Sequence, residues 1–351
     1  MKKLILTSLF LFGGVGLLKA QQPVEGTTYF LPKTAMRFSF LVEKTVYTPG
    51  EFAQYAERYM KETDVNFEPS TTYRIIHTSM TPLGVPDSSK QYTLSLNKKY
   101  TISNVSLDDN GVLLAVNAKG RKASIPAPYV PGRKPAVLNP KDFMNEDILT
   151  AGSSAKMAEL CAQEIYDIRD SRAQLSKGKA DTMPKDGEQL KLMLNNLDTQ
   201  EKALLQVFNG MTVKDTTEVV MTFIPQKETS KKLFFRFSQR LGFTDIDDLG
   251  GAPYYIITED EHTIANTDPS LKNEKKEKDD INLNVNVPDK IKVSLYEQER
   301  LMASFEFYAA QFGKTENLSG ELFGKKQTTR MVLNPITGGI EHLQSEAIVL
   351  Y

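Results

Sequence analysis

The feature that most constrains the fold is a change in the spacing of apolar residues along the chain. Residues 34–46 alternate between apolar and polar side chains, with Met36, Phe38 and Phe40 on one face, which is typical of a half-buried strand. Over residues 157–208 the apolar side chains recur at helical spacing, and beyond this region the alternation returns. The sequence therefore predicts an α+β fold that is mostly antiparallel β, with two β-rich modules on either side of an α-helical hairpin.

These changes of period set the expected boundaries. We expect a signal peptide at 1–20, an N-terminal β-rich module at 21–150, a helical hairpin at 151–210 and a C-terminal antiparallel β-sandwich-like domain at 211–351. Asp186 is expected to begin the second helix of the hairpin. With 351 residues and a hydrophobic content of 40%, the chain is long enough to bury more than one core.

Two local signals refine the N-terminal module. Thr48-Pro49-Gly50-Glu51 predicts a helix start, with Thr48 as the capping residue, Pro49 in the first helical position and Glu51 completing a capping box. Further along, Asp108-Asp109-Asn110-Gly111 separates two alternating stretches. Because Asn-Gly readily adopts the positive φ angles of a tight turn, this segment predicts a β-hairpin.

The N-terminus has the pattern of a secretory signal peptide. Lys2 and Lys3 precede an apolar stretch at 4–18, which ends near the small residue Ala20. The stretch is too short to span a membrane as a helix and no later stretch is longer, so we expect no transmembrane segment after signal removal. Removal takes away three of the 43 basic side chains and leaves 40 against 44 acidic ones. This mildly acidic balance predicts that the protein does not bind nucleic acid.

Residues 119–140 combine prolines with basic side chains and contain no acidic residue. Proline removes a backbone hydrogen-bond donor, so we expect an extended arm, and the first interpretation is a plain connector. The alternative is a docking arm, because a proline-rich segment has a preformed shape that a partner can bind. The candidate partner-binding residues are Arg121, Lys122, Arg133 and Lys134.

The sequence contains no recognisable catalytic, cofactor-binding or metal-binding motif. One cysteine and three histidines are too few and too scattered for a zinc site, and Cys161 lies on the apolar side of a predicted helix. The acidic stretch 245–250 lacks calcium ligands at loop positions 5 and 12. Nucleophile-elbow, P-loop and dinucleotide-binding patterns are also missing. The sequence does not exclude a pair of carboxylates that hydrolyses glycosidic bonds, because the distance between two such groups depends on the fold.

Several separated stretches together resemble the domain-of-unknown-function family numbered 4831, which comprises exported proteins of gram-negative bacteria of the Bacteroidales kind. The stretches are residues 29–34, 44–57, 164–169, 311–313 and 334–338. The resemblance implies a location in the periplasm or on the periplasmic face of the outer membrane. The family has no assigned activity, so the resemblance implies no catalytic residue.

The resemblance also implies a modification. In the bacteria where this family occurs, exported proteins are commonly O-glycosylated at Asp-Ser or Asp-Thr followed by an apolar residue or threonine. Thr182 and Thr216 fit this pattern, and Thr182 lies in the expected turn between two helices, where it is the more accessible acceptor. Chance recurrence of so short a motif is the alternative explanation.

These observations favour a non-catalytic exported envelope protein that binds or scaffolds a partner. We expect that partner to be an envelope protein or an outer-membrane complex. The alternative is a carboxylate-dependent hydrolase that acts on an envelope or imported glycan or peptide, because such enzymes leave no local signature in the sequence.

Overall fold

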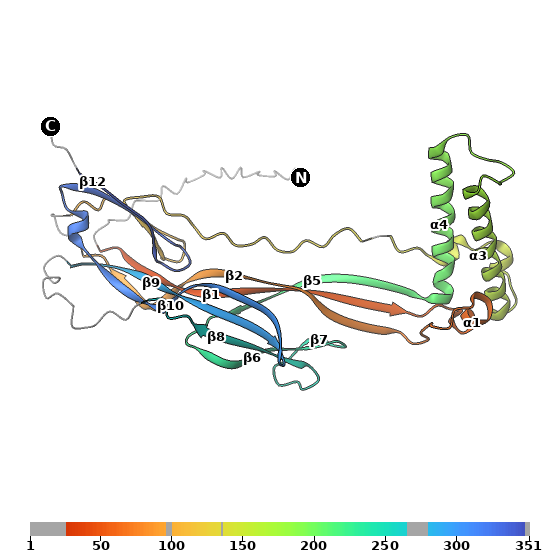
Figure 1. The fold of residues 1–351 in the computed structure, drawn as a ribbon, viewed down its shortest axis with the longest axis horizontal. Helices are drawn as coiled ribbons and strands as arrows, with labels where there is room; N and C mark the ends of the chain where they lie inside the picture. Colours follow the sequence, from red (N-terminus) through yellow and green to blue (C-terminus); the bar gives the residue numbers. More distant parts are fainter. Residues whose placement is uncertain (1–25, 96–99, 135, 265–279, 348–351) are drawn as a thin grey trace, which may run out of the picture.

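The computed structural model describes residues 26–95, 100–134, 136–264 and 280–347. The molecule is elongated, with three β-sheets along its length and a pair of long helices at one end (Figure 1). All pairings between named strands are antiparallel. The predicted α+β class, mostly antiparallel β, is confirmed.

The first sheet is built around one very long strand. Its order is β2 (Ser70–Thr93), β1 (Thr28–Thr48) and β5 (Met211–Phe223). The alternation read from the sequence places Met36, Phe38 and Phe40 on the buried face of β1, where none of them is exposed. The opposite face of this sheet carries polar residues such as Ser39 and Glu218, which lie on neighbouring strands.

The second sheet packs its apolar face against the first. Its order is β10 (Arg300–Ser319), β9 (Asp280–Glu297), β8 (Ala252–Asp260), β6 (Thr229–Ser238) and β7 (Gly242–Thr244). The shared core is rich in aromatic rings: the ring centroids of Phe40 and Phe235 are 4.9 Å apart, and those of Phe38 and Phe234 are 5.1 Å apart. Edge-to-face and tilted contacts of this kind stabilise a core beyond the burial of apolar area alone.

The third sheet lies at the end of the molecule opposite the helices (Figure 1). Its order is β12 (Ile340–Ala347), β11 (Gln327–Leu333), β4 (Leu113–Val116) and β3 (Val105–Leu107), and a short helical turn at Gly320–Phe323 packs against it. The predicted hairpin between β3 and β4 is present. Only Gly111 in the turn has a positive φ, 79°, and the carboxylate of Asp108 accepts hydrogen bonds from the N–H groups of Asn110 and Val112.

The sheets combine strands from both of the predicted β-rich modules. β1, from the predicted module 21–150, pairs along much of its length with β5, from the predicted domain 211–351. β4 likewise pairs with β11. The expected division therefore does not coincide with the sheets, because a strand as long as β1 finds partners from both sides of the helical hairpin.

The helical end contains the predicted hairpin and several shorter elements. They are a 3-10 turn at Ala53–Tyr55, α1 (Ala56–Met60), a 3-10 turn at Pro140–Phe143, α2 (Glu146–Leu149), α3 (Ser154–Ser176) and α4 (Gly187–Asn209). Asp186 caps α4 as expected, since its carboxylate accepts a hydrogen bond from the N–H of Glu188.

The capping box expected at Thr48 is wrong. Thr48 is the last residue of β1, and the first helical turn begins at Ala53 without a side-chain cap. The connection is held instead by α4: the N–H of Phe52 donates to the carbonyl of Val207 at 2.6 Å. This long-range bond takes the role that the sequence pattern assigned to a local cap.

Candidate interaction surfaces

The proline-rich arm is an extended segment that connects the two ends of the molecule. Residues 119–134 and 136–139 form neither helix nor strand. In Figure 1 the arm runs from the sheet that contains β12 to the helical end, along the body of the molecule. It therefore links elements far apart in space, as the connector interpretation requires.

Three of the four candidate basic residues are ion-paired with carboxylates of the same chain. Their nitrogen–oxygen distances are 3.0 Å for Arg121–Glu341, 2.7 Å for Lys122–Asp109 and 2.9 Å for Lys134–Asp215. Arg133 is exposed. The basic side chains therefore fasten the arm to the body while all four remain at the surface.

Glu218 on β5 holds the middle of the arm. Its carboxylate accepts a hydrogen bond from the backbone N–H of Tyr129 at 2.9 Å, and another from the hydroxyl of Ser39 at 2.5 Å. The Ser39 hydroxyl first, and then the Tyr129 N–H, hold the pKa of the Glu218 carboxyl below its usual range. Sequence reasoning missed this residue, because an acid on the polar face of a strand gives no local signal of the segment that will cross it.

The anchor near the helical end has the same electrostatic character. Asp215, also on β5, accepts a hydrogen bond from the ammonium of Lys134, which lowers the pKa of the Asp215 carboxyl. Both anchors therefore favour the ionised form of a carboxylate on β5. These two negative charges therefore hold the arm against the body together with the Arg121–Glu341 and Lys122–Asp109 ion pairs.

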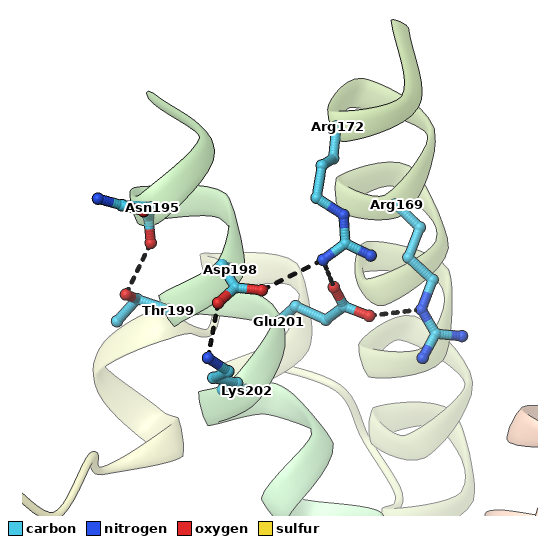
Figure 2. A network of polar contacts seen from close by, with 7 residues as sticks. All are labelled: Arg169, Arg172, Asn195, Asp198, Thr199, Glu201 and Lys202. Atoms are coloured by element: carbon cyan, nitrogen blue, oxygen red, sulfur yellow. Dashed lines mark hydrogen bonds and ion pairs between the residues drawn. The ribbon is translucent and has the colours of Figure 1, made fainter. Parts of the chain in front are cut away.

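A network of charged residues joins α3 to α4 (Figure 2). Glu201 is 6% exposed, and its two carboxylate oxygens lie 2.6 Å from Nε of Arg169 and 2.5 Å from Nη1 of Arg172. Asp198 pairs with Arg172 at 3.3 Å and with Lys202 at 2.6 Å, and the Lys202 hydrogen bond is the main reason that the pKa of Asp198 is lowered.

The arginine charges of α3 are therefore paired with carboxylates of the same protein. Charges as dense as those around Arg169 and Arg172 usually pair with charges three or four residues away on the same helix. The structure instead pairs these two arginines with residues of the neighbouring helix. Their side chains keep 35% and 37% exposure, so the network lies at the edge of the helical interface.

Three of the stretches that carry the family resemblance meet at one junction. The side-chain amide of Gln311 accepts a hydrogen bond from the N–H of Thr34 and donates to the carbonyls of Thr34 and Pro225, all at 2.8–2.9 Å. The hydroxyl of Thr34 donates to the carbonyl of Ile336. The side chain of Gln311 thus makes the hydrogen bonds to the backbone of β1 that a neighbouring strand would make, at the point where the pairing of β10 is irregular.

Among the surface cavities lined by described residues, three lie at different places on the molecule. The first, about 440 Å³, is lined by Tyr254 and Glu297, whose hydrogen bond is 2.8 Å long. The second, about 380 Å³, lies beside the junction and is lined by two carboxylates, Glu316 and Glu341. The third, about 340 Å³, lies where the arm meets the helical end and includes Val137.

The two candidate glycosylation acceptors differ in exposure. Thr182 is exposed in the connection between α3 and α4. Thr216 is half-buried on β5, opposite Glu43 of β1. Both remain predictions, and the structure makes Thr182 the more accessible of the two.

Cys161 is fully buried in the core of the helical end. This burial raises the pKa of its thiol to about 12, so the reactive thiolate is scarce at neutral pH. Within the described ranges, no group of three or more histidine, cysteine, aspartate or glutamate residues could hold a metal ion. No helix of the described residues is long and apolar enough to cross a membrane.

Comparison with known proteins gives one match. A family model described as Domain of unknown function (DUF4831) matches residues 25–341 of the chain. The match includes the helical end and every named strand except most of β12, which it enters at its first two residues. No curated protein and no solved structure matches the chain.

Proposed function

The chain belongs to the family described as Domain of unknown function (DUF4831), and we propose that it is a non-catalytic, exported envelope protein that binds or scaffolds a partner. The partner is an envelope protein or an outer-membrane complex, located in the periplasm or at the periplasmic face of the outer membrane. The signal-peptide pattern of residues 1–20 supports export.

The observation that carries the proposal is the arm. It keeps Arg121, Lys122, Arg133 and Lys134 at the surface while charged contacts hold it against the body. It also exposes large apolar side chains, with Ile125 at 70% and Val130 at 81%. A segment that combines exposed apolar and basic side chains and has a defined path is suited to binding another protein.

The test is to replace the four basic residues together by serine and to compare envelope proteins cross-linked to the wild type and to the variant. We expect one defined envelope protein to be captured by the wild type and lost from the variant. Retention of every partner by the four-serine variant would remove the arm from the proposed function.

A matched control separates lost contacts from a loosened arm. The variant Asp109→Asn, Asp215→Asn, Glu341→Gln breaks the same three intramolecular ion pairs but keeps all four basic side chains. If the basic residues bind the partner directly, this control keeps it. Equal loss in both variants would mean that arm position, and not arm charge, supports binding.

The alternative function is a carboxylate-dependent hydrolase of an envelope or imported glycan or peptide. One specific observation favours it: Glu316 and Glu341 line the same cavity beside the junction. Most glycoside hydrolases use two carboxyl groups that flank the bond they cleave. Turnover of a glycan or peptide substrate that disappears in Glu316→Gln or Glu341→Gln would overturn the non-enzyme proposal.

O-glycosylation at Thr182 is a separate proposal, supported by its exposure between α3 and α4. We expect the protein purified from its own envelope to exceed the mass of the unmodified mature chain, and the Thr182→Ala variant to lose that excess. Thr216→Ala is the matched control and should change the mass little. A native mass equal to that of the bare chain would eliminate the modification.

A further inference from the structure

The arm has a three-residue pattern of burial. Between Arg121 and Lys134, the residues that are partly buried are Ala123, Pro126 and Tyr129, and the rest are exposed. A polyproline II helix has three residues per turn, so residues three apart lie along one edge. The arm therefore directs one edge to the protein and leaves its other two edges in solvent.

The exposed edges carry a regular motif. Residues 127–133 read Ala-Pro-Tyr-Val-Pro-Gly-Arg, in which two dipeptides of a small or branched apolar residue and proline are three residues apart. In a polyproline II helix this spacing is about 9 Å. Ala127, Pro128, Val130 and Pro131 are all exposed, and only Tyr129 between them is partly buried.

The basic end of the motif is also free to bind. Arg133 follows the second proline by two residues, is exposed, and forms no ion pair with any residue that the structure describes. Its guanidinium can form paired hydrogen bonds with a carboxylate of another protein. A complementary groove would thus have two apolar pockets and an acidic residue at one end.

The contacts of the arm prepare it for binding. The Tyr129 N–H bond to Glu218 holds the backbone before the second dipeptide, and the Lys134–Asp215 ion pair ties a side chain after it to β5. A segment that is already extended and held loses less conformational entropy on binding than a free chain does. Both anchors use the inward edge or the chain beyond the motif, so they leave the motif uncovered.

From this geometry we infer that residues 127–133 are a polyproline II ligand for a protein domain with an aromatic-lined groove and an acidic residue at its rim. This inference rests on the proposed function and specifies its partner class. Aromatic-lined grooves recognise such segments because the polyproline II helix is preformed and presents its prolines in a fixed register.

The test uses the full mature protein and a purified SH3 domain whose proline-binding groove has an acidic rim. Isothermal titration should detect saturable binding to the wild type. The double variant Pro128→Ala, Pro131→Ala should weaken binding at least tenfold, and Arg133→Glu should also weaken it. All of these side chains are exposed, so thermal unfolding should confirm that the variants remain folded.

Pro126→Ala is the matched control, because Pro126 lies on the inward edge of the same arm. We expect it to change the affinity by less than threefold. Absence of saturable binding to the wild type, or equal binding by the Pro128/Pro131 variant, would overturn the inference. Either result would leave the cross-linking test of the proposed function intact, because that test scores an envelope partner and does not assume a proline-binding groove.

Discussion

At the scale of single residues, Glu201 combines burial with charge. It is 6% exposed and accepts bonds from both Arg169 and Arg172. Removing one member of a buried ion pair leaves the remaining charges without their partner. Glu201 therefore matters more for the stability of the helical end than any single exposed ion pair on the surface.

We predict that Glu201→Ala lowers the free energy of unfolding by about 2 kcal/mol, less than for a fully buried pair because water reaches both arginines. Chemical denaturation followed by circular dichroism measures this. Asp198→Ala is the control on the same helix: its side chain is 45% exposed and its ion pairs are screened by water, so the loss should be clearly smaller than that of Glu201→Ala. Equal losses of unfolding free energy in the two variants would contradict the conclusion that Glu201 contributes more than an exposed ion pair does.

Gly50 is required for a steric reason. A β-carbon at this position would lie 2.3 Å from the carbonyl oxygen of Val207, on the backbone of α4. Neither backbone can yield easily there, because the neighbouring Phe52 N–H donates to that same carbonyl. The close approach explains why glycine occupies position 50, just after the end of β1.

We predict that Gly50→Ala destabilises the protein by about 2 kcal/mol or more, since it separates the end of β1 from α4. Gly187→Ala is the control at the start of α4, where a β-carbon meets nothing within 4 Å. That variant should be neutral or stabilising by up to about 1 kcal/mol, because alanine favours helix more than glycine does. Thermal unfolding of both variants provides the comparison, and a stable Gly50→Ala protein would show that the contact can relax.

At the scale of elements, docking of the arm is linked to pH through β5. The pKa of Asp215 is lowered in the folded protein mainly by the hydrogen bond from Lys134 of the arm. The pKa of Glu218 is lowered first by the Ser39 hydroxyl of β1 and then by the Tyr129 N–H of the arm. A carboxyl whose pKa is lowered in the docked state stabilises that state at pH values above its ordinary pKa of about 4. This stabilisation is lost as the pH falls through the lower pKa that the carboxyl has in the docked state.

We therefore predict that the arm stays docked from pH 8 to about pH 5 and loosens below about pH 4. Hydrogen exchange of the Tyr129 N–H, corrected for the intrinsic rate at each pH, reports the docking directly. Glu218→Gln should reduce this protection already at pH 7 and weaken its dependence on pH. Constant protection into acid would show that the arm is held by contacts other than these carboxylates.

At the scale of the whole molecule, the long strands join chain segments on both sides of the hairpin. β1 pairs with β2 and β5, and its apolar face packs against residues of the second sheet. The sheets therefore form one cooperative body, in which neither of the two predicted β-rich modules has a complete set of partners of its own.

We predict that a single cut in the arm leaves the molecule assembled. Limited proteolysis should cleave first within residues 119–140, because residues 119–134 and 136–139 lie outside helices and strands. Because β1 and β5 remain paired, the two fragments should elute together in gel filtration and separate only in denaturant. Separation in native buffer, or earlier cleavage inside α4, would contradict this description. The mixed-charge stretch 267–284 also favours early cleavage by its sequence, and it lies mostly outside the described residues.

The sequence alone determined the features that depend on neighbouring residues. The two-residue period predicted the buried face of β1, the helical period and Asp186 predicted the hairpin, and Gly111 marked the turn between β3 and β4. Each of these signals is local, since a side chain's direction follows from the backbone geometry of its own element.

Only the tertiary structure decided which segments met. Glu218 receives the arm, Gln311 bonds the backbone of β1, and the Val207 carbonyl replaces the expected cap at Thr48. In each pair the two groups lie far apart in the sequence, and each group could have formed its hydrogen bond with water or with another polar group instead. For Glu218 the choice came from the pairing of β1 with β5, because strand register along a shared sheet sets which distant residues become neighbours. For Gln311 and Val207 it came from the packing of β10 against β1 and of α4 against the turn that follows β1.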